Sequence, residues 1–365
     1  MPTLKKIVIQ DFRNIVFQEL AFSPNINCIS GNNGEGKTNL MDAIWYLSMT
    51  KSAFSASDRF NFRHGCETFA LAGTYAMNTG PDARFSLQVN SAGEKKVRRD
   101  DKLYSKISEH IGVLPIVMVS PEDISLVSDS GEERRRFVNA VLSQMDREYL
   151  SAVQQYNRLL YQRNRLLKDS SPDEDLLSVF DTKMAEHATR IHSTRERFVT
   201  DLVPVVAAYY KTLSGGQEEV FIAYNSDLSK GPLDRLLKDS REKDFYFKYT
   251  TLGIHRDDFL FKMNGHPIRR CGSQGQQKSF LVSLKFAQYE IMKREYGFPP
   301  ILLLDDVFDK LDMGRISNLI GMVAGNDFGQ IFITDSNKVR MSGIVDKITE
   351  DRSYFEAIAG EFKTL

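Results

Sequence analysis

Eight residues near the N-terminus have the types and the spacing of a phosphate-binding loop. They read Gly31-Asn32-Asn33-Gly34-Glu35-Gly36-Lys37-Thr38, which is the Gly-x-x-x-x-Gly-Lys-Thr pattern of a P-loop. The glycines let the backbone curl until successive N–H groups converge on phosphate oxygens, while Lys37 adds a charge and the Thr38 hydroxyl can hold Mg²⁺. A chance match in a turn rich in glycine and asparagine is the alternative. The apolar run before the loop, 26–29, and the helical pattern after it, 40–47, favour phosphate binding.

A second cluster with anion chemistry opens a helical pattern in the C-terminal third. Ser273-Gln274-Gly275-Gln276 precedes a strongly periodic segment that extends to about residue 296. The N-terminal amides and the positive dipole end of such a helix suit an anion. The alternative is that Ser273 only caps its own helix. The similar fragment that begins at Ser214 is followed by a strand pattern, so we interpret it as a loop.

Two carboxylates follow an apolar run farther along the chain. Residues 301–304 are all apolar and lead directly to Asp305 and Asp306, and a comparable run, 330–333, leads to Thr334. All-apolar strands are typical of a parallel sheet that is covered on both faces. Ligands of such sheets lie at the carboxyl ends of the strands, so we expect Asp305, Asp306, Thr334 and the P-loop to meet there.

The elements that position these groups are predicted from periodicity. We expect an N-terminal hairpin leading to the P-loop strand, then an antiparallel layer of short alternating strands, and then the apolar strand 114–119. The hairpin covers 4–9 and 16–22, and the layer includes 68–76, 84–89 and 95–99.

The middle of the chain has a helical period instead. Apolar residues step by threes and fours through 138–166 and 177–198, which predicts two antiparallel helices that form a short, coiled-coil-like arm. Asp146 is a candidate cap for a fresh helix midway, Arg163 occupies the one vacant apolar position, and His187 is interpreted as a packed or interfacial residue of the seam. Pro204 is expected to end or kink the second helix. We interpret segments 220–224 and 246–249 as strands.

Composition limits the class of protein. A chain of 365 residues suggests two or three units, and 48 basic against 48 acidic side chains leave no global charge that would attract a nucleic acid. Three widely spaced cysteines without a Cys-x-x-Cys pair indicate a reduced protein without a structural zinc. No apolar run reaches membrane-spanning length, so we expect a soluble, cytoplasmic protein with no membrane partner.

Together the three clusters resemble the ABC-type ATPase heads of the SMC, Rad50 and RecF group. Several other segments are similar to the RecF family of bacterial DNA repair, over residues 4 to about 335. They are Leu4-x-x-Ile7-x-Ile9-x-Asp11-Phe12-Arg13-Asn14, 37–44, Ser120-Pro121-Glu122-Asp123, Arg134-Arg135-Arg136-Phe137, 156–160 with 162–164, Gly253-x-His255-Arg256-Asp257-Asp258, and 273–278. Leu311-Asp312 after Asp306 belongs to the wider constellation of the ABC-type heads. Ile254 stands where the family usually has proline. The chain also has Gly131-Glu132-Glu133 in place of a turn that contains more proline.

The resemblance implies an α/β fold. It consists of an ABC-type P-loop ATPase head, in which a mixed sheet lies beside an antiparallel β-layer, and a helical coiled-coil-like arm. The head is expected to be discontinuous, at 1–120 and 250–365, and the arm to cover 121–249.

The resemblance also implies roles for the clusters in binding ATP and Mg²⁺. Residues 31–38 and Asn39 would hold the nucleotide, with Lys37 on the β- and γ-phosphates and with Thr38 and Asp305 on the metal. Asp306 would stand where many relatives place the glutamate that polarises water; the alternative is that it only orients Asp305 or the metal. Ser273, Gly275 and Gln276 would meet the nucleotide of a second subunit, so the chain is expected to form a homodimer when ATP is bound.

The function that the resemblance implies is that of a recombination mediator. Such a protein would be a weak, DNA-stimulated ATPase that binds duplex or gapped DNA and works with RecO- and RecR-like partners to load recombinase in DNA repair, replication restart and the SOS response. Lys95-Lys96, Arg98-Arg99, residues 134–136, Arg158, Arg163, Arg165 and Lys168 offer phosphate contacts, although a solvated charged face is the simpler interpretation of each. His255 and Arg256 are interpreted as structural or as communicating with the nucleotide, and Arg13 as a residue that approaches it.

Two other functions share this constellation. One is the ATPase subunit of a transporter, which is disfavoured by the long arm, by the lack of a clear glutamine loop and by the lack of a histidine after 331–333. The other is an ATPase that regulates a nuclease or toxin partner, which predicts a fused or neighbouring effector domain.

Overall fold

The structure is a computed structural model of the chain. It describes residues 1–169, 173–216, 218–307, 313–323, 328–337, 343, 345–346 and 349–365. The expected Leu311-Asp312 pair therefore lies outside the described residues. By their internal contacts the residues form two compact units, Met1–Asp123 with Lys285–Leu365 and Ile124–Leu284.

The first unit contains two six-stranded sheets. One is antiparallel throughout, in the order β2-β1-β4-β5-β6-β7, and includes the predicted hairpin and the predicted antiparallel layer. Its strands are β1 Thr3–Phe12, β2 Ile15–Ala21, β4 Thr68–Ala76, β5 Ala83–Asn90, β6 Lys95–Arg99 and β7 Lys102–Leu103.

The second sheet of this unit is mostly parallel, in the order β15-β14-β3-β13-β12-β8. Only β15 pairs antiparallel, with β14. The P-loop strand β3 lies between β13 and β14, so strands from the two ends of the sequence are hydrogen-bonded neighbours. The strands are β3 Ile26–Ser30, β8 Ile116–Val119, β12 Ile301–Leu304, β13 Ile331–Asp335, β14 Arg352–Ile358 and β15 Glu361–Thr364.

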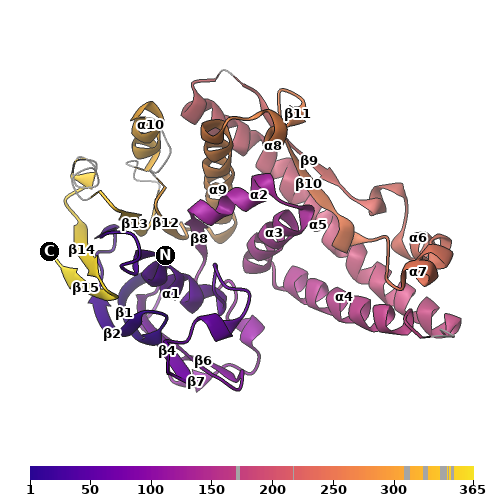
Figure 1. The fold of residues 1–365 in the computed structure, drawn as a ribbon, viewed down its shortest axis with the longest axis horizontal. Coiled ribbons are helices and arrows are strands. Elements are labelled where there is room, and N and C mark those ends of the chain that lie inside the picture. The colour runs from indigo at the N-terminus through magenta and orange to yellow at the C-terminus, as the bar shows by residue number, and fades with distance from the viewer. Residues whose placement is uncertain are drawn as a thin grey trace. The chain divides into compact units, whose positions relative to one another are not determined.

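Helix α1 (Lys37–Met49) contacts both sheets of the first unit. Its neighbours are β1, β4 and β5 of the antiparallel sheet and β8 and β13 of the parallel sheet (Figure 1). Ten of its thirteen residues are buried, so apolar contacts on two sides fix the helix that begins at the P-loop lysine. Short helices complete the unit at η1 Asp58–Phe60, η2 Ile107–Glu109, η3 Pro121–Ile124 and α10 Met313–Val323.

The second unit is mainly helical and includes the predicted arm. Helices α4 (Arg147–Leu166) and α5 (Glu174–Ser214) lie side by side, and α3 (Gly131–Met145) precedes them (Figure 1). Asp146 caps α4 as predicted, because its Oδ1 accepts from the N–H groups of Glu148 (2.8 Å) and Tyr149 (3.0 Å). The remaining elements are α2 Ser125–Ser128, β9 Val220–Asn225, η4 Asp227–Lys230, α6 Leu233–Asp239, α7 Arg241–Phe247, η5 Ile254–Arg256, β10 Asp258–Met263, β11 His266–Pro267, α8 Ile268–Cys271 and α9 Gln274–Tyr296, whose last residues belong to the first unit.

Three expectations about this unit are corrected. Residues 246–249 do not form a strand: 241–247 are helical, because Arg241 and Asp244 are ion-paired with side chains of α4 and α5. Pro204 does not end α5, since the buried stripe of Leu202, Val206 and Tyr210 continues past it. Residues 250–284, expected in the head, cluster with the second unit because β10 pairs with β9.

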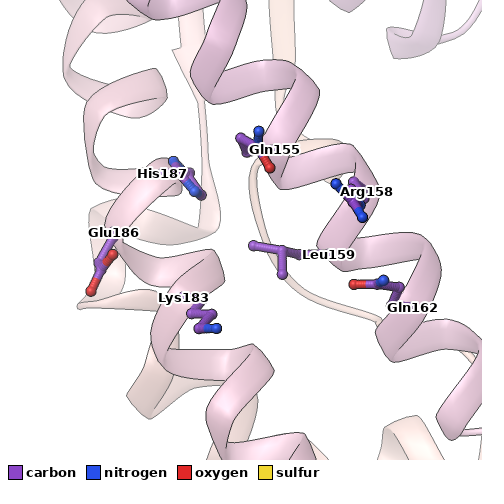
Figure 2. Close-up of a pocket in the computed structure, with 7 residues that line it drawn as sticks. All are labelled: Gln155, Arg158, Leu159, Gln162, Lys183, Glu186 and His187. Carbon is purple, nitrogen blue, oxygen red and sulfur yellow. The ribbon is translucent and has the colours of Figure 1, made fainter.

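The seam between α4 and α5 buries apolar side chains together with the Arg163–Asp181 ion pair, and it opens at His187. There a cavity of about 300 Å³ is lined by polar side chains with Leu159 among them. Figure 2 shows that four lining residues come from α4 and three from α5: Gln155, Arg158, Leu159, Gln162, Lys183, Glu186 and His187. His187 is half-buried at this cavity, which agrees with the seam position predicted for it.

Candidate functional site

The P-loop connects β3 to α1, and at two of its positions a side chain would collide with neighbouring atoms. A Cβ on Gly31 would lie 2.6 Å from the carbonyl oxygen of Ala357 on β14. Gly36 has a φ of 105° in the left-handed region, and a Cβ there would lie 2.9 Å from the side chain of Asn14. The loop is therefore closely enclosed by neighbouring backbone and side chains, and the motif glycines are required by the fold.

Lys37 is the first residue of α1 and is only 4% exposed. Its Nζ donates to the carbonyl oxygens of Gly31 (2.7 Å) and Asn32 (3.0 Å). Within the described part of the chain, the hydrogen bonds of this ammonium go to backbone carbonyls of its own loop, not to a carboxylate. An ammonium that the loop surrounds in this way suits a phosphate oxygen as a further acceptor.

Asp305 follows β12 and joins three strand ends, as the sequence predicted. Its Oδ2 accepts from the Thr38 hydroxyl (2.9 Å) and its Oδ1 from the Thr334 hydroxyl (2.7 Å). Burial raises the pKa of this carboxyl to about 6, although both hydroxyls act in the opposite direction. A hydroxyl and a carboxylate this close are the hard oxygen donors that Mg²⁺ prefers, so these two residues fit the metal.

Asp306 is held by its backbone at the same edge. Its φ of 44° lies in the left-handed region, which aspartate tolerates better than most residues, and its N–H donates to the Thr334 hydroxyl (3.0 Å). The side chain is half-buried. The structure thus brings Asp305, Asp306, Thr334 and the P-loop together in one unit.

Asn39 and Arg13 form a polar network beside the loop. Asn39 accepts from Arg13 Nη1 (3.0 Å) and donates to Asn14 Oδ1 (2.7 Å), and Arg13 is ion-paired with Asp42 (2.6 Å). Burial raises the pKa of Asp42, and the Arg13 guanidinium partly offsets that effect. Asn39 and Asp42 both belong to α1. Because the Arg13 guanidinium bonds both of them, Arg13 stabilises the helix that follows the P-loop.

The sequence analysis did not predict the C-terminal hairpin that is hydrogen-bonded to the P-loop. The carbonyl oxygen of Glu35 accepts from the N–H of Gly360 (2.9 Å), and its carboxylate accepts from the N–H of Ala359. Both donors lie in the turn between β14 and β15. The sequence signal was available, because Gly360 separates two short alternating runs at the end of the chain.

The residues Ser273, Gly275 and Gln276 belong to the second unit and open α9. The Ser273 N–H donates to Gln276 Oε1 (2.7 Å), and the Ser273 hydroxyl accepts from the Gln276 N–H (3.3 Å). This reciprocal pair is a capping box, so Ser273 caps its helix as the alternative predicted. Ser273 is also exposed, and the cap does not exclude contact with another molecule.

Several cations suggested as DNA contacts have structural partners. Arg134 is buried and ion-paired with Asp258 (2.8 Å), and Arg163 is fully buried between Asp181 and Asp244 (2.7 Å to each). The hypothesis of a DNA contact is wrong for these two residues, because a phosphate cannot reach them. Arg158, Arg165 and Lys168 are exposed on α4.

The Gly253–Asp258 segment is structural for most of its side chains. His255 Nδ1 is 2.8 Å from the Tyr156 hydroxyl, and its Nε2 is 3.1 Å from the Thr250 carbonyl oxygen. Burial lowers the pKa of His255 to about 4, so the ring is neutral. Asp257 is ion-paired with the buried Arg195 (2.5 Å). The structural interpretation of His255 is therefore supported.

No helix of the described residues combines the length and the apolar character needed to cross a bilayer. Among the same residues, no group of three or more His, Cys, Asp or Glu side chains is arranged to hold a metal ion.

Comparison with known proteins identifies relatives along the whole chain. The family model described as the RecF/RecN/SMC N terminal domain matches residues 3–350. The DNA replication and repair protein RecF of Porphyromonas gingivalis is 42% identical, over 98% of this chain and 99% of the relative. The protein of the same name from Bacteroides fragilis is 41% identical, over 98% and 97%. Neither relative is described as a transporter component or as a regulator of a nuclease or toxin.

Solved structures agree in fold. A structure of the recombination mediator protein RecF-ATP in the RecFOR pathway superposes with a TM-score of 0.90 at 30% identity, over 100% of this chain and 98% of that chain. The Smc head domain of Pyrococcus furiosus, bound to the C-terminal domain of ScpA, has a TM-score of 0.59 at 15% identity, over 100% and 96%. The second likeness supports the expected ABC-type head with an arm at the level of fold alone.

Proposed function

This chain belongs to the RecF family of DNA replication and repair proteins, and on that premise we propose that it is an ATP-gated, DNA-binding recombination mediator. The observation that carries the proposal is the contact of Thr38 and Thr334 with Asp305, which joins the P-loop to the ends of two parallel strands. A relative of known structure is described as RecF-ATP, which supports ATP as the nucleotide.

The residues of the first unit divide the binding of ATP and Mg²⁺ among themselves. The P-loop amides and the Lys37 ammonium would bind the phosphates, and Thr38 with Asp305 would hold the metal. Bound Mg²⁺ would neutralise part of the phosphate charge. Asp305 must be ionised to serve as a ligand, and its two hydroxyl donors favour that state.

Asp306 is the candidate general base for the attacking water. Its backbone N–H donates to the Thr334 hydroxyl, which fixes the point from which its carboxylate would reach the water. Aspartate is one methylene shorter than glutamate, and a less direct reach to water is consistent with slow turnover. Hydrolysis would then act as a timer that limits how long the protein stays in its ATP-bound form.

Ser273, Gly275 and Gln276 would complete the site of a second subunit. These residues lie in the unit that lacks the P-loop, at the N-terminus of the 23-residue helix α9. The positive dipole end of such a helix is suited to a γ-phosphate. Two ATP molecules would thus be enclosed between two copies, and the dimer would form only when ATP is bound.

The dimer would bind duplex or gapped DNA and support recombinase loading with RecO- and RecR-like partners, with DNA stimulating the weak ATPase. The family membership and the RecFOR pathway of the solved relative support this role. Balanced overall charge means that DNA affinity must come from local patches, so we expect it to depend strongly on salt.

Sedimentation with and without ATP, in the presence and absence of gapped duplex DNA, tests the proposal. We expect a monomer without nucleotide, a dimer with ATP, and DNA binding that weakens as salt is raised. Ser273→Arg should abolish the dimer while ATP affinity per chain is unchanged. Ser214→Arg, in the similar fragment that ends α5, is the matched control and should leave the dimer intact. An ATP-bound dimer of Ser273→Arg would refute the composite site, and no DNA binding at low salt would refute the function.

A further inference from the structure

One face of α4 combines cations with an exposed aromatic ring. Arg158, Tyr161 and Arg165 recur every three or four residues and therefore share that face, and Lys168 follows at the same spacing in the turn that ends α4; we call these four residues the α4 stripe. All four are exposed, and Tyr161 keeps 65% of its surface accessible. In the part of the chain that the structure describes, the three cations form no ion pair. Residues 149–168 contain no aspartate or glutamate, so this stretch of the chain itself carries only positive charge.

A second group of exposed rings lies on and after α7. Tyr246 is 79% exposed, and Phe247 and Tyr249 also remain largely accessible. Their rings touch in sequence, with centroids 5.0 Å apart for Tyr246–Phe247 and 5.8 Å apart for Phe247–Tyr249. Contiguous exposed aromatic residues are uncommon on a protein surface and usually mark a binding site. We call these three residues the α7 aromatics.

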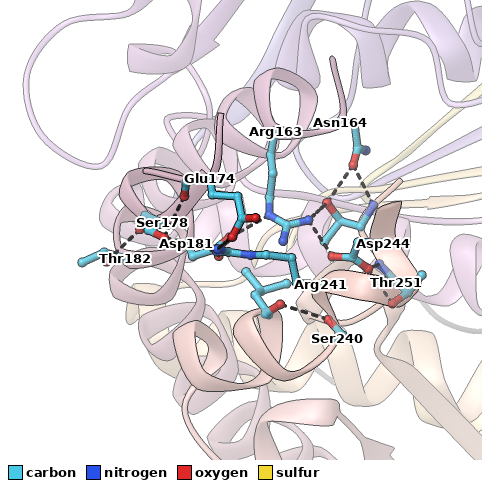
Figure 3. Close-up of polar contacts among 12 residues, drawn as sticks. Arg163, Asn164, Glu174, Ser178, Asp181, Thr182, Ser240, Arg241, Asp244 and Thr251 are labelled. Carbon is cyan, nitrogen blue, oxygen red and sulfur yellow. Dashed lines mark hydrogen bonds and ion pairs between the residues drawn. The ribbon is translucent and has the colours of Figure 1, made fainter. Parts of the chain in front are cut away.

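The α7 aromatics are held in place by a buried network of charges. A helix of seven residues is not stable by itself, so α7 depends on its contacts. Arg163 of α4 bonds Asp244 of α7 (2.7 Å), and Arg241 of α7 bonds Asp181 of α5 (2.6 Å), as Figure 3 shows. The network holds the backbone that carries Tyr246 and Phe247 in place before any ligand arrives, which reduces the entropy cost of binding.

The stripe and the aromatics adjoin one another. The N–H and hydroxyl of Thr250 both donate to Asn164 Oδ1 of α4 (2.8 and 2.7 Å), and Thr250 directly follows Tyr249. Asn164 is three residues after Tyr161 and four before Lys168, which makes both its neighbours on the helix surface. The segment that carries Tyr249 is therefore anchored one helical turn from the α4 stripe.

We propose that the α4 stripe and the α7 aromatics bind single-stranded DNA. Unpaired bases can stack on exposed aromatic faces, and the cations beside those faces match the phosphates of the strand, whereas paired bases of a duplex expose no such faces. Arg158 also lines the cavity between α4 and α5, to which α5 contributes the cation Lys183 and the carboxylate Glu186 (Figure 2). A protein partner is less well matched, because its surface would have to be acidic along the whole stripe.

This inference rests on the proposed DNA-binding function and adds to it. It identifies the single-stranded part of a gapped substrate as the feature that the second unit recognises. Two exposed lysines, Lys243 and Lys248, and one exposed glutamate, Glu242, lie beside the α7 aromatics in the sequence. The net local charge is therefore positive, which suits a phosphate chain.

Fluorescence anisotropy of the full chain with labelled oligonucleotides tests the inference. The probes are a single strand, a blunt duplex, and a duplex with a single-stranded tail. For Tyr246→Ala with Tyr249→Ala, we expect affinity for the single strand and the tailed duplex to fall about 5- to 150-fold for each stacked base lost. Affinity for the blunt duplex should not change. For Arg165→Gln with Lys168→Gln, the salt dependence of single-strand binding, as log K against log salt, should become shallower by about 1.4.

Two matched controls separate stacking and charge from general effects of surface substitution. Phe221→Ala removes an exposed aromatic ring of β9 in the same unit, and Arg197→Gln removes an exposed cation of α5. Neither change should alter single-strand affinity. Equal losses on blunt duplex and single strand, or no loss on the single strand, would overturn the inference. Unchanged DNA affinity with lost binding of a RecR-like partner would also overturn it, in favour of a protein-docking surface. A wild-type chain that binds no DNA would instead refute the proposed function.

Discussion

Lys37 and Arg163 are both buried cations, yet their partners differ in kind. The Lys37 ammonium is bonded to carbonyl oxygens of its own loop, whereas the Arg163 guanidinium is enclosed by the carboxylates of Asp181 and Asp244. A carbonyl partner carries no full negative charge, so the ammonium remains attractive to an incoming phosphate. Carboxylate partners neutralise the charge within the fold, so the guanidinium joins helices instead of binding a ligand. Burial alone does not distinguish a ligand-binding cation from a structural one.

Replacing Arg163 should produce the largest effect, on stability. Arg163→Ala leaves two buried carboxylates without their cation, and we expect the free energy of unfolding to fall by about 3–5 kcal/mol. Far-UV circular dichroism in urea measures the helices, while fluorescence of the single tryptophan, Trp45, reports on α1 of the first unit. The circular dichroism midpoint should shift more than the Trp45 midpoint. Arg165→Ala, an exposed arginine of the same helix, should change stability little, and equal effects of the two substitutions would contradict the structural role.

Replacing Lys37 should affect the ligand instead of the fold. For Lys37→Met we expect ATP turnover to fall about 10²- to 10³-fold, because a charge aimed at the phosphates is lost. Thermal melting without nucleotide should change little, since the ammonium bonds only backbone oxygens of the loop. A large loss of stability without ATP would place Lys37 in the same class as Arg163.

Asp306 gives a finer test within the first unit. Asp306→Asn keeps the size of the side chain, and asparagine also tolerates the left-handed backbone at this position. We expect ATP affinity to be retained and turnover to fall about 10²-fold, at the lower end of the range for a general base. Single-turnover hydrolysis at saturating ATP measures this step. Unchanged turnover would show that Asp306 only orients Asp305 or the metal.

The pH dependence of His255 should give the smallest effect. Its folded pKa, about 4, lies below the ordinary value of 6.5, so the unfolded chain binds a proton that the folded chain does not. This group stabilises the fold above pH 6.5 and loses that contribution as pH falls toward 4, by about 2 kcal/mol between pH 7 and 5. Urea unfolding at pH 7 and pH 5 measures this contribution. The loss of unfolding free energy between the two pH values should be smaller by that amount in His255→Gln than in the wild type. An identical pH dependence in variant and wild type would rule out the buried neutral imidazole.

The sequence predicted which residues meet at the candidate phosphate site, because these residues stand in short motifs or at strand ends. Thr38 and Asp305 are 267 residues apart, yet both follow apolar runs of one parallel sheet, and the rule for such sheets brought them together. The elements on either side of these residues were also predicted from local periodicity. Once a parallel α/β sheet had been predicted, the convergence of the residues that follow its strands could be predicted as well.

The arm was predicted as two helices, but the meaning of its polar positions was not. Arg163 looked like an exception in an apolar series and a possible DNA contact, because its partner Asp244 lies 81 residues away and no local pattern pairs them. The same distant contacts turned 241–247 into a helix, although its aromatic residues favour a strand. An ion pair between two distant elements produces no periodic pattern in the sequence. The buried ion pairs of the arm could therefore not be predicted from periodicity.

The position of β3 between β13 and β14 has a consequence for synthesis. The P-loop strand is made within the first 30 residues, yet both of its sheet neighbours and the turn that clasps Glu35 come from the last 35 residues of the chain. The second unit, at 124–284, is synthesised completely before those neighbours exist. A growing polypeptide would therefore form its arm before it could complete its P-loop. In the proposed ATP-bound dimer, a copy that has not yet made residues 331–364 would be unable to join a finished one through the nucleotide.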